Sequence, residues 1–133
     1  MTVNKNTLCI ITVSILTALC VSAPAADKGI HLKSTRTVSS TWNTADGAGY
    51  QWNIYVAGGY VNSGSHSAYS SGMQLQINGS GFSGSSSGRV NKDNTEIEIG
   101  PWRRGSVNIY RRIYVDKKIG YCRWIDIFEN TAS

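Results

Sequence analysis

The sequence predicts an all-β fold, a small antiparallel meander or β-sandwich of about six strands. Apolar and polar residues alternate in several short runs, and none of these runs follows a helical period. Clusters of Gly, Asn, Asp and Ser separate the runs, as expected for turns. Parallel strands would need crossovers of a dozen or more residues, which favours antiparallel pairing. With 133 residues, the chain has the length of one ordinary domain.

The first 25 residues are predicted to be a signal peptide. Lys5 provides a positive start, and the apolar run 8–21 is shorter than the ~20 residues that a membrane span needs. Ala23 and Ala25 have the spacing that a signal peptidase recognises. We therefore expect cleavage after Ala25, export to a secreted or periplasmic location, and no membrane span in the mature chain.

Two alternatives remain for this segment, namely lipoprotein processing at Cys20 and retention as an N-terminal anchor. Cleavage would remove Cys9 and Cys20 and leave Cys122 alone, so the mature chain has no intrachain disulfide. A lone cysteine is most often buried, and the alternatives are pairing with another chain or a reactive thiol. His31 and His66 do not form a ligand-spacing pattern with it, and we expect neither a metal nor a cofactor.

The mature chain, residues 26–133, is expected to be a single β-rich domain with a Gly/Ser-rich middle. The expected strands are 36–42, 50–57, 73–78, 95–99, 107–115 and 121–128. Gly and Ser supply 18 of the 32 residues in 57–88, so 63–72 and 80–88 are expected to be loops. A cross-β segment is the alternative, but internal repeats are missing.

The clearest hairpin joins 107–115 to 121–128 through the five-residue link 116–120. If Val115 pairs with Tyr121, Arg112 lies opposite Trp124, with Asp126 on the diagonal. One face of the hairpin then carries aromatic rings together with an arginine and a carboxylate. Aromatic rings beside a planar donor and a carboxylate are typical of sugar-binding surfaces, and also of ordinary sheet packing. The candidate ligand-binding residues on this face are Tyr110, Arg112, Tyr114, Trp124 and Asp126.

Charge is concentrated near the C-terminus. The formal net charge is +5, and seven Lys and Arg residues fall between Arg103 and Arg123. Export argues against a nucleic-acid partner and favours a glycan or an anionic component of the cell envelope. The alternative is that these charges protect an exposed strand edge from aggregation.

Two acidic motifs contain residues typical of catalytic or metal sites. Glu96 and Glu98 lie on one face of a predicted strand, about 7 Å apart, a spacing compatible with glycoside hydrolysis. Pairing with nearby arginines is the alternative, and no catalytic residue is assigned. The motif 46–49 resembles a cation loop, but one carboxylate is too few for calcium.

The sequence therefore predicts an exported, non-catalytic binding or interaction module, with carbohydrate or another envelope component as its partner. The first alternative is a structural protein that associates with itself through a sheet edge. The second, a small glycoside hydrolase, depends on Glu96 and Glu98 alone.

Overall fold

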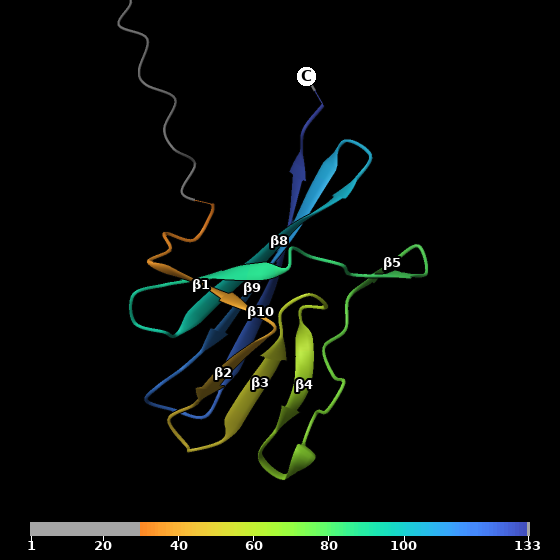
Figure 1. Cartoon of the computed structure of the whole chain (residues 1–133). Helices are drawn as coiled ribbons and strands as arrows, with labels where there is room; N and C mark the ends of the chain where they lie inside the picture. Colours follow the sequence, from red (N-terminus) through yellow and green to blue (C-terminus); the bar gives the residue numbers. More distant parts are fainter. Residues whose placement is uncertain (1–29, 133) are drawn as a thin grey trace, which may run out of the picture.

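Residues 30–132 are described by a computed structural model, and they form an antiparallel β-sandwich, which confirms the all-β prediction (Figure 1). The large sheet has the strand order β1-β7-β8-β9-β10, and the small sheet has the order β2-β3-β4. The large-sheet strands are β1 (Arg36–Ser39), β7 (Ser87–Val90), β8 (Glu96–Arg104), β9 (Val107–Val115) and β10 (Cys122–Asn130). The small-sheet strands are β2 (Thr41–Ala45), β3 (Gln51–Tyr55) and β4 (Tyr60–Gly64). A separate two-stranded hairpin consists of β5 (Gln76–Ile77) and β6 (Ser80–Gly81), and a short 3-10 turn, η1, spans Ser65–Ser67.

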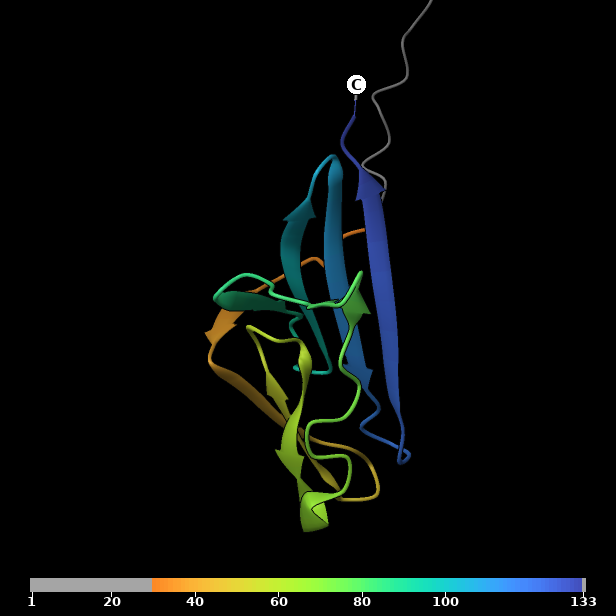
Figure 2. The same cartoon turned by 90° about the vertical axis from the view of Figure 1, so that its right-hand side faces the viewer.

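The hydrophobic core lies between the two sheets, which form two layers in Figure 2. Trp42, Ile54 and Val61 come from the small sheet and are almost fully buried. Ile97 and Ile113 meet them from the large sheet and are also fully buried. Burying an aliphatic side chain of this size contributes about 1.5–3 kcal/mol, so this layer supplies the main driving force for folding.

The predicted strand 36–42 is two strands that belong to different sheets. Ser40 separates them with a φ of 71°, a left-handed conformation that interrupts an extended strand. The Ser40 carbonyl accepts a hydrogen bond from the Val56 N–H at 2.8 Å. The chain therefore crosses from the large sheet to the small sheet at Ser40.

The strand count of about six was too low, because the Gly/Ser-rich middle contains strands that alternation did not reveal. β4 lies within it and β7 begins within it, and β7 lies between β1 and β8 in the large sheet. A Cβ on Gly88 would lie 2.6 Å from Ile97 Cδ1, so the isoleucine occupies the space of a missing side chain. A glycine in a strand often marks such a close approach, and the local pattern then resembles a loop.

The predicted signal peptide, residues 1–25, lies outside the described residues, so this domain boundary stays a prediction. Within residues 30–132, no helix has the length and apolar character to cross a membrane.

Candidate functional site

The five candidate binding residues are divided between the two faces of the last hairpin. Val115 lies opposite Cys122 and not opposite Tyr121. The predicted register was therefore wrong by one residue, and such a slip moves every side chain of a strand to the opposite face. The outer face of the large sheet holds Tyr110, Arg112 and Tyr114, and the inner face holds Trp124 and Asp126.

The turn between β9 and β10 accounts for this register. The Asp116 N–H donates to the Tyr121 carbonyl at 3.0 Å, so the link contains four residues and not five. The Asp116 carboxylate accepts from the N–H groups of Ile119 at 2.8 Å and Lys118 at 2.7 Å. These two hydrogen bonds lower the pKa of the Asp116 carboxyl below its ordinary value. The length of the turn thus depends on side-chain to backbone bonds, which alternation does not report.

On the outer face, Arg112 and Tyr114 are engaged in contacts within the chain. Arg112 donates to Glu96 Oε2 at 2.9 Å and to the Ile30 carbonyl at 3.0 Å. The Tyr114 hydroxyl donates to Asp116 Oδ2 at 3.0 Å, and this hydrogen bond raises the pKa of Tyr114. Both side chains therefore contribute to the structure of this face.

Tyr110 is also part of the outer face and is only 8% exposed. Its hydroxyl donates to Glu129 Oε2 at 3.4 Å, and its ring lies 4.5 Å from the His31 ring. Burial, followed by the charge of Glu129, raises the pKa of Tyr110. The segment that contains His31 covers this ring, so Tyr110 offers no open stacking surface.

Glu96 and Glu98 are both buried beneath side chains of the outer face. Glu98 accepts from the Leu32 N–H at 2.9 Å and forms an ion pair with Arg89. Glu96 pairs with Arg112, one of the arginines expected as a partner from the sequence. Neither carboxylate lines the cavity described below. Their geometry is that of a structural ion-pair network.

On the inner face, Arg111 makes the contacts that the sequence suggested for Arg112. Its guanidinium lies 4.9 Å from the Trp124 ring centroid, and its Nε lies 2.7 Å from Asp126 Oδ1. Burial lowers the pKa of Arg111, and the charge of Asp126 opposes this shift. Arg111 also donates to the carbonyls of Gly59 at 2.7 Å and Met73 at 2.6 Å. The predicted combination of an arginine, an indole ring and a carboxylate is therefore present, formed by Arg111, Trp124 and Asp126, but it is mostly buried.

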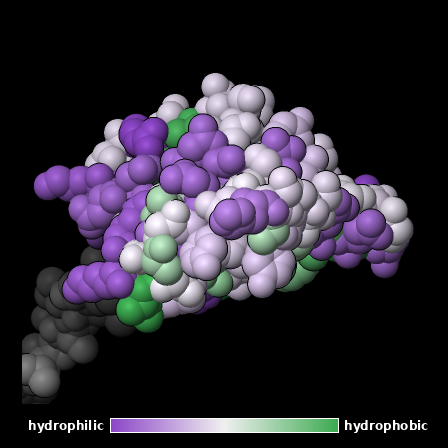
Figure 3. Space-filling model, turned by 90° about the horizontal axis from the view of Figure 1, so that it is seen from below, coloured by the Kyte–Doolittle hydropathy of each residue, from purple (hydrophilic) through white to green (hydrophobic). Residues whose placement is uncertain are grey.

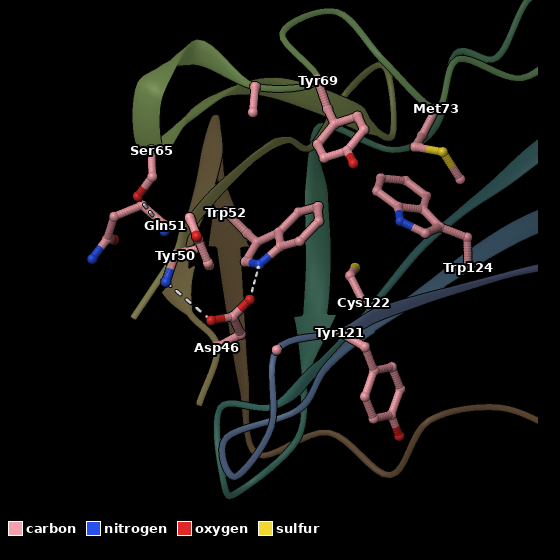
Figure 4. Close-up of a pocket in the computed structure, with 12 residues that line it drawn as sticks. Asp46, Tyr50, Gln51, Trp52, Ser65, Tyr69, Met73, Tyr121, Cys122 and Trp124 are labelled. Atoms are coloured by element: carbon pink, nitrogen blue, oxygen red, sulfur yellow. Dashed lines mark hydrogen bonds between the residues drawn. The ribbon is translucent and has the colours of Figure 1, made fainter. Parts of the chain in front are cut away.

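A cavity of about 510 Å³ opens between the sheets beside this cluster. Trp52 enters it from β3, Trp124 and Cys122 enter it from β10, and the segment 65–73 contributes Tyr69 (Figure 4). Its lining residues are mainly aromatic or small: Asp46, Tyr50, Gln51, Trp52, Ser65, Ala68, Tyr69, Met73, Gly120, Tyr121, Cys122 and Trp124. This volume lies in the range of small-molecule binding sites.

Asp46 fixes the orientation of the Trp52 ring on one side of the cavity. Its Oδ2 accepts from Trp52 Nε1 at 3.1 Å, and its Oδ1 accepts from the N–H groups of Ala48 and Tyr50, both at 3.0 Å. Three donors therefore satisfy this carboxylate, which is buried at the end of β2. The motif 46–49 thus builds a turn around Asp46 that holds the indole ring.

The segment 65–73 carries the most exposed aromatic ring of the cavity. Tyr69 is 70% exposed, and its ring is nearly parallel to that of Trp52 at a centroid distance of 6.2 Å. The segment is joined to β3 by a hydrogen bond from the Gln51 N–H to Ser65 Oγ at 2.8 Å. A stretch expected from its composition to be a loop therefore places an aromatic ring over the cavity.

Cys122 lies on the cavity wall and is half-buried. Burial raises the pKa of its thiol to about 12, while a hydrogen bond with Trp124 acts in the opposite direction. The thiolate is the reactive form of cysteine. Cys122 is therefore a protonated, unreactive thiol at neutral pH.

The end of the molecule viewed in Figure 3 is mostly hydrophilic or neutral, with few strongly hydrophobic side chains. Tyr50, Tyr69 and Tyr121 are exposed by 53%, 70% and 42% respectively. Exposed tyrosine rings combine an apolar face with a polar hydroxyl. The cavity region is therefore suited to a ligand that has both apolar faces and hydroxyl groups.

Sequence reasoning identified Trp124 but missed Trp52, Tyr69 and Asp46 as members of one site. The signal was present in part, since the motif 46–49 resembles a cation loop. The sequence pattern did not show the packing of the two sheets, which brings β3 near β10.

Among residues 30–132 there is no group of three or more His, Cys, Asp or Glu side chains that could hold a metal ion. Comparisons of the chain with models of protein families, with curated protein sequences and with solved structures found no match.

Proposed function

We propose that this chain is an exported, non-catalytic carbohydrate-binding module whose ligand occupies the cavity between the sheets. The observation that carries the proposal is the convergence of three aromatic rings from separate segments, those of Trp52, Tyr69 and Trp124. Export is supported by the sequence of residues 1–25 alone.

The cavity supplies the two kinds of contact that a sugar requires. Aromatic rings pack on the apolar C–H faces of a pyranose, and neighbouring polar groups bond to its hydroxyls. Gln51, Ser65 and the Tyr69 hydroxyl line the cavity and provide these polar groups. Asp46 serves a different purpose, because its carboxylate is already satisfied by donors within the chain.

The cavity favours a neutral glycan over an acidic one. No Lys, Arg or His is among its lining residues. The basic residues of the C-terminal region are distributed over the sheet. Arg103 and Arg104 end β8 beside the start of β9, and Lys117 and Lys118 lie in the turn that follows β9. Binding of an anionic envelope component, which the basic cluster suggested, is therefore the second outcome to be tested.

The test is an array of neutral and acidic oligosaccharides, followed by titration of the best ligand with tryptophan fluorescence as the readout. Tyr69→Ala removes an exposed ring, so we expect binding to weaken by about 1–3 kcal/mol while stability changes little. Tyr55→Ala is the matched control, because Tyr55 is 37% exposed and lies outside the cavity.

Equal affinity of the Tyr69→Ala variant and the wild type would show that the ligand binds elsewhere. Binding to acidic glycans only, with affinity lost at high salt, would replace this proposal by the anionic-partner alternative.

A further inference from the structure

β10 is the terminal strand of the large sheet, and its outer edge pairs with no other strand among residues 30–132. Figure 2 shows its full length along one side of the sandwich. Exposed edges are normally short, or are protected by charged side chains, Pro or a bulge. β10 is nine residues long, contains no Pro, and pairs with β9 without a register shift. Its charged residues are Arg123, Asp126 and Glu129, and Asp126 is already paired with Arg111. The opposite edge strand, β1, has only four residues.

The hydrogen bonds at both ends of the hairpin show which backbone groups point outward. The Asp116 N–H donates to the Tyr121 carbonyl, and the Thr131 N–H donates to the Ser106 carbonyl. In an antiparallel ladder, hydrogen-bonded and non-hydrogen-bonded pairs alternate. The odd-numbered residues of β10 therefore bond to β9, and the even-numbered residues direct their N–H and C=O groups away from it. The residues with outward groups are Cys122, Trp124, Asp126, Phe128 and Asn130.

We propose that β10 is the interface of a symmetric homodimer, in which a second copy of this chain adds its own β10 antiparallel to the first. The two-fold axis passes beside Asp126. Each residue of one β10 then lies opposite a residue of the second copy's β10, and the two residues are equally distant in sequence from Asp126 on its two sides. Such an interface is self-complementary, as two-fold symmetry requires, and it joins the two large sheets into one continuous sheet.

The side chains of β10 match one another in this register. On the outer face, Arg123 of each copy lies opposite Glu129 of the other, and Ile125 lies opposite Ile127. The side chains of Arg123 and Glu129 are 53% and 41% exposed, so each has room for this pair besides its contact with Glu96 or Tyr110 in its own chain. Cross-strand pairs of opposite charge and of branched apolar residues stabilise a sheet.

On the inner face, the proposed register places Trp124 of each copy opposite Phe128 of the other. Phe128 is 58% exposed in the single chain, and this contact would cover it. Asp126 lies opposite its own copy, where like charges oppose each other, but each carboxylate is paired with Arg111. The contact also brings Phe128 of the second copy beside Trp124, which lines the cavity.

Neighbouring registers lack this complementarity. Moving the axis by one residue to Ile125 places Arg123 opposite Ile127. Moving it to Ile127 places Arg123 opposite Thr131. In either case both ion pairs are lost, so the charges favour the axis at Asp126.

Analytical ultracentrifugation of protein purified after expression of the full sequence tests the proposal. We expect a concentration-dependent equilibrium between one copy and two. Arg123→Glu alone would place two acidic residues opposite each other at both ends, and Glu129→Arg alone would place two basic residues there. Each single substitution should therefore raise the dimer dissociation constant by roughly 100-fold or more.

Mixing the two variants provides the decisive measurement. A heterodimer of Arg123→Glu with Glu129→Arg restores an opposite-charge pair at both ends, so the mixture should dimerise although neither variant does so alone. Circular dichroism of each variant checks that it folds, and misfolded chains would not recover on mixing.

A wild-type protein that stays monomeric over the whole concentration series would overturn the proposal. It would also be overturned if the mixture dimerised no better than the separate variants, or if β10 were covered by an extended segment of a different protein. None of these measurements involves a sugar, so the outcome is independent of the proposed carbohydrate binding.

Discussion

Arg111 and Asp126 lie directly opposite each other on β9 and β10 and form an ion pair on the inner face of the large sheet. The Arg111 side chain is 4% exposed, whereas that of Asp126 is 28% exposed. The Arg111 guanidinium also donates hydrogen bonds to the carbonyls of Gly59 and Met73, so it connects the large sheet to the segments that border the cavity. This cluster links the stability of the sandwich to the shape of the candidate site.

The first prediction concerns this ion pair. Arg111→Ala should lower the free energy of unfolding by about 3–5 kcal/mol, because it removes one partner of a largely buried pair and leaves two carbonyls unsatisfied. Asp126→Ala should cost about 3 kcal/mol, because it leaves the buried guanidinium of Arg111 with its two carbonyl contacts but without a counter-charge. Urea denaturation of both single variants and the double variant gives the coupling energy. Purely additive effects would contradict the ion pair, and the exposed Arg103→Ala serves as a control.

The second prediction concerns Asp46 as a positioning residue for Trp52. Asp46→Ala leaves three donors without their acceptor, so it should lower the free energy of unfolding by about 1–3 kcal/mol and weaken sugar binding. Asp46→Asn keeps one acceptor oxygen and should recover part of both effects. The tryptophan fluorescence emission spectrum reports a change in the environment of Trp52. Asp93→Ala, which removes an exposed carboxylate, is the control. An unchanged spectrum in Asp46→Ala would show that the hydrogen bond does not orient the ring.

The third prediction concerns Cys122. Since burial raises the pKa of this thiol to about 12, its thiolate is scarce at pH 8. Alkylation of the native protein should be roughly a thousandfold slower than that of an exposed cysteine, and it should become fast in denaturant. Mass spectrometry after timed treatment with iodoacetamide measures both rates. Rapid labelling of the folded protein would mean that the cavity wall is more open or more polar at this position.

The fourth prediction concerns the pH dependence set by Asp116. Its pKa is lower in the folded protein than the ordinary value of 3.8, so the unfolded chain binds more protons in this range. The resulting stabilisation is present above pH 3.8 and is lost as the pH falls through the lower folded-state pKa. Urea denaturation between pH 2 and pH 6 should show a smaller acid dependence for Asp116→Asn than for the wild type. The same dependence in both proteins would assign the acid sensitivity to other carboxylates.

The alternation in the C-terminal region predicted β9 with its observed ends and most of β10, because side-chain alternation is a local property of an extended strand. The same pattern also suggested that an arginine lies over Trp124 beside Asp126. The structure contains that arrangement, but with Arg111 in place of Arg112. The difference comes from one residue in the turn, where the Asp116 carboxylate bonds to the backbone of its own loop.

Strands within the Gly/Ser-rich middle escaped detection for a related reason. Gly88 faces Ile97 so closely that the isoleucine occupies the space of its missing side chain. The strand therefore depends on a partner that follows later in the sequence. Composition indicates a flexible loop at such a site, because the stabilising contact is not local.

By itself the sequence determined that the described chain is all-β, since alternation and turn residues act over a few neighbouring positions. Only the tertiary structure decided the strand order, the register of the last hairpin and the membership of the cavity. Trp52, Tyr69 and Trp124 come from separate segments and meet because β3 and β10 belong to two sheets packed on one core. Such meetings depend on the packing of distant segments, which a local pattern of residues does not specify.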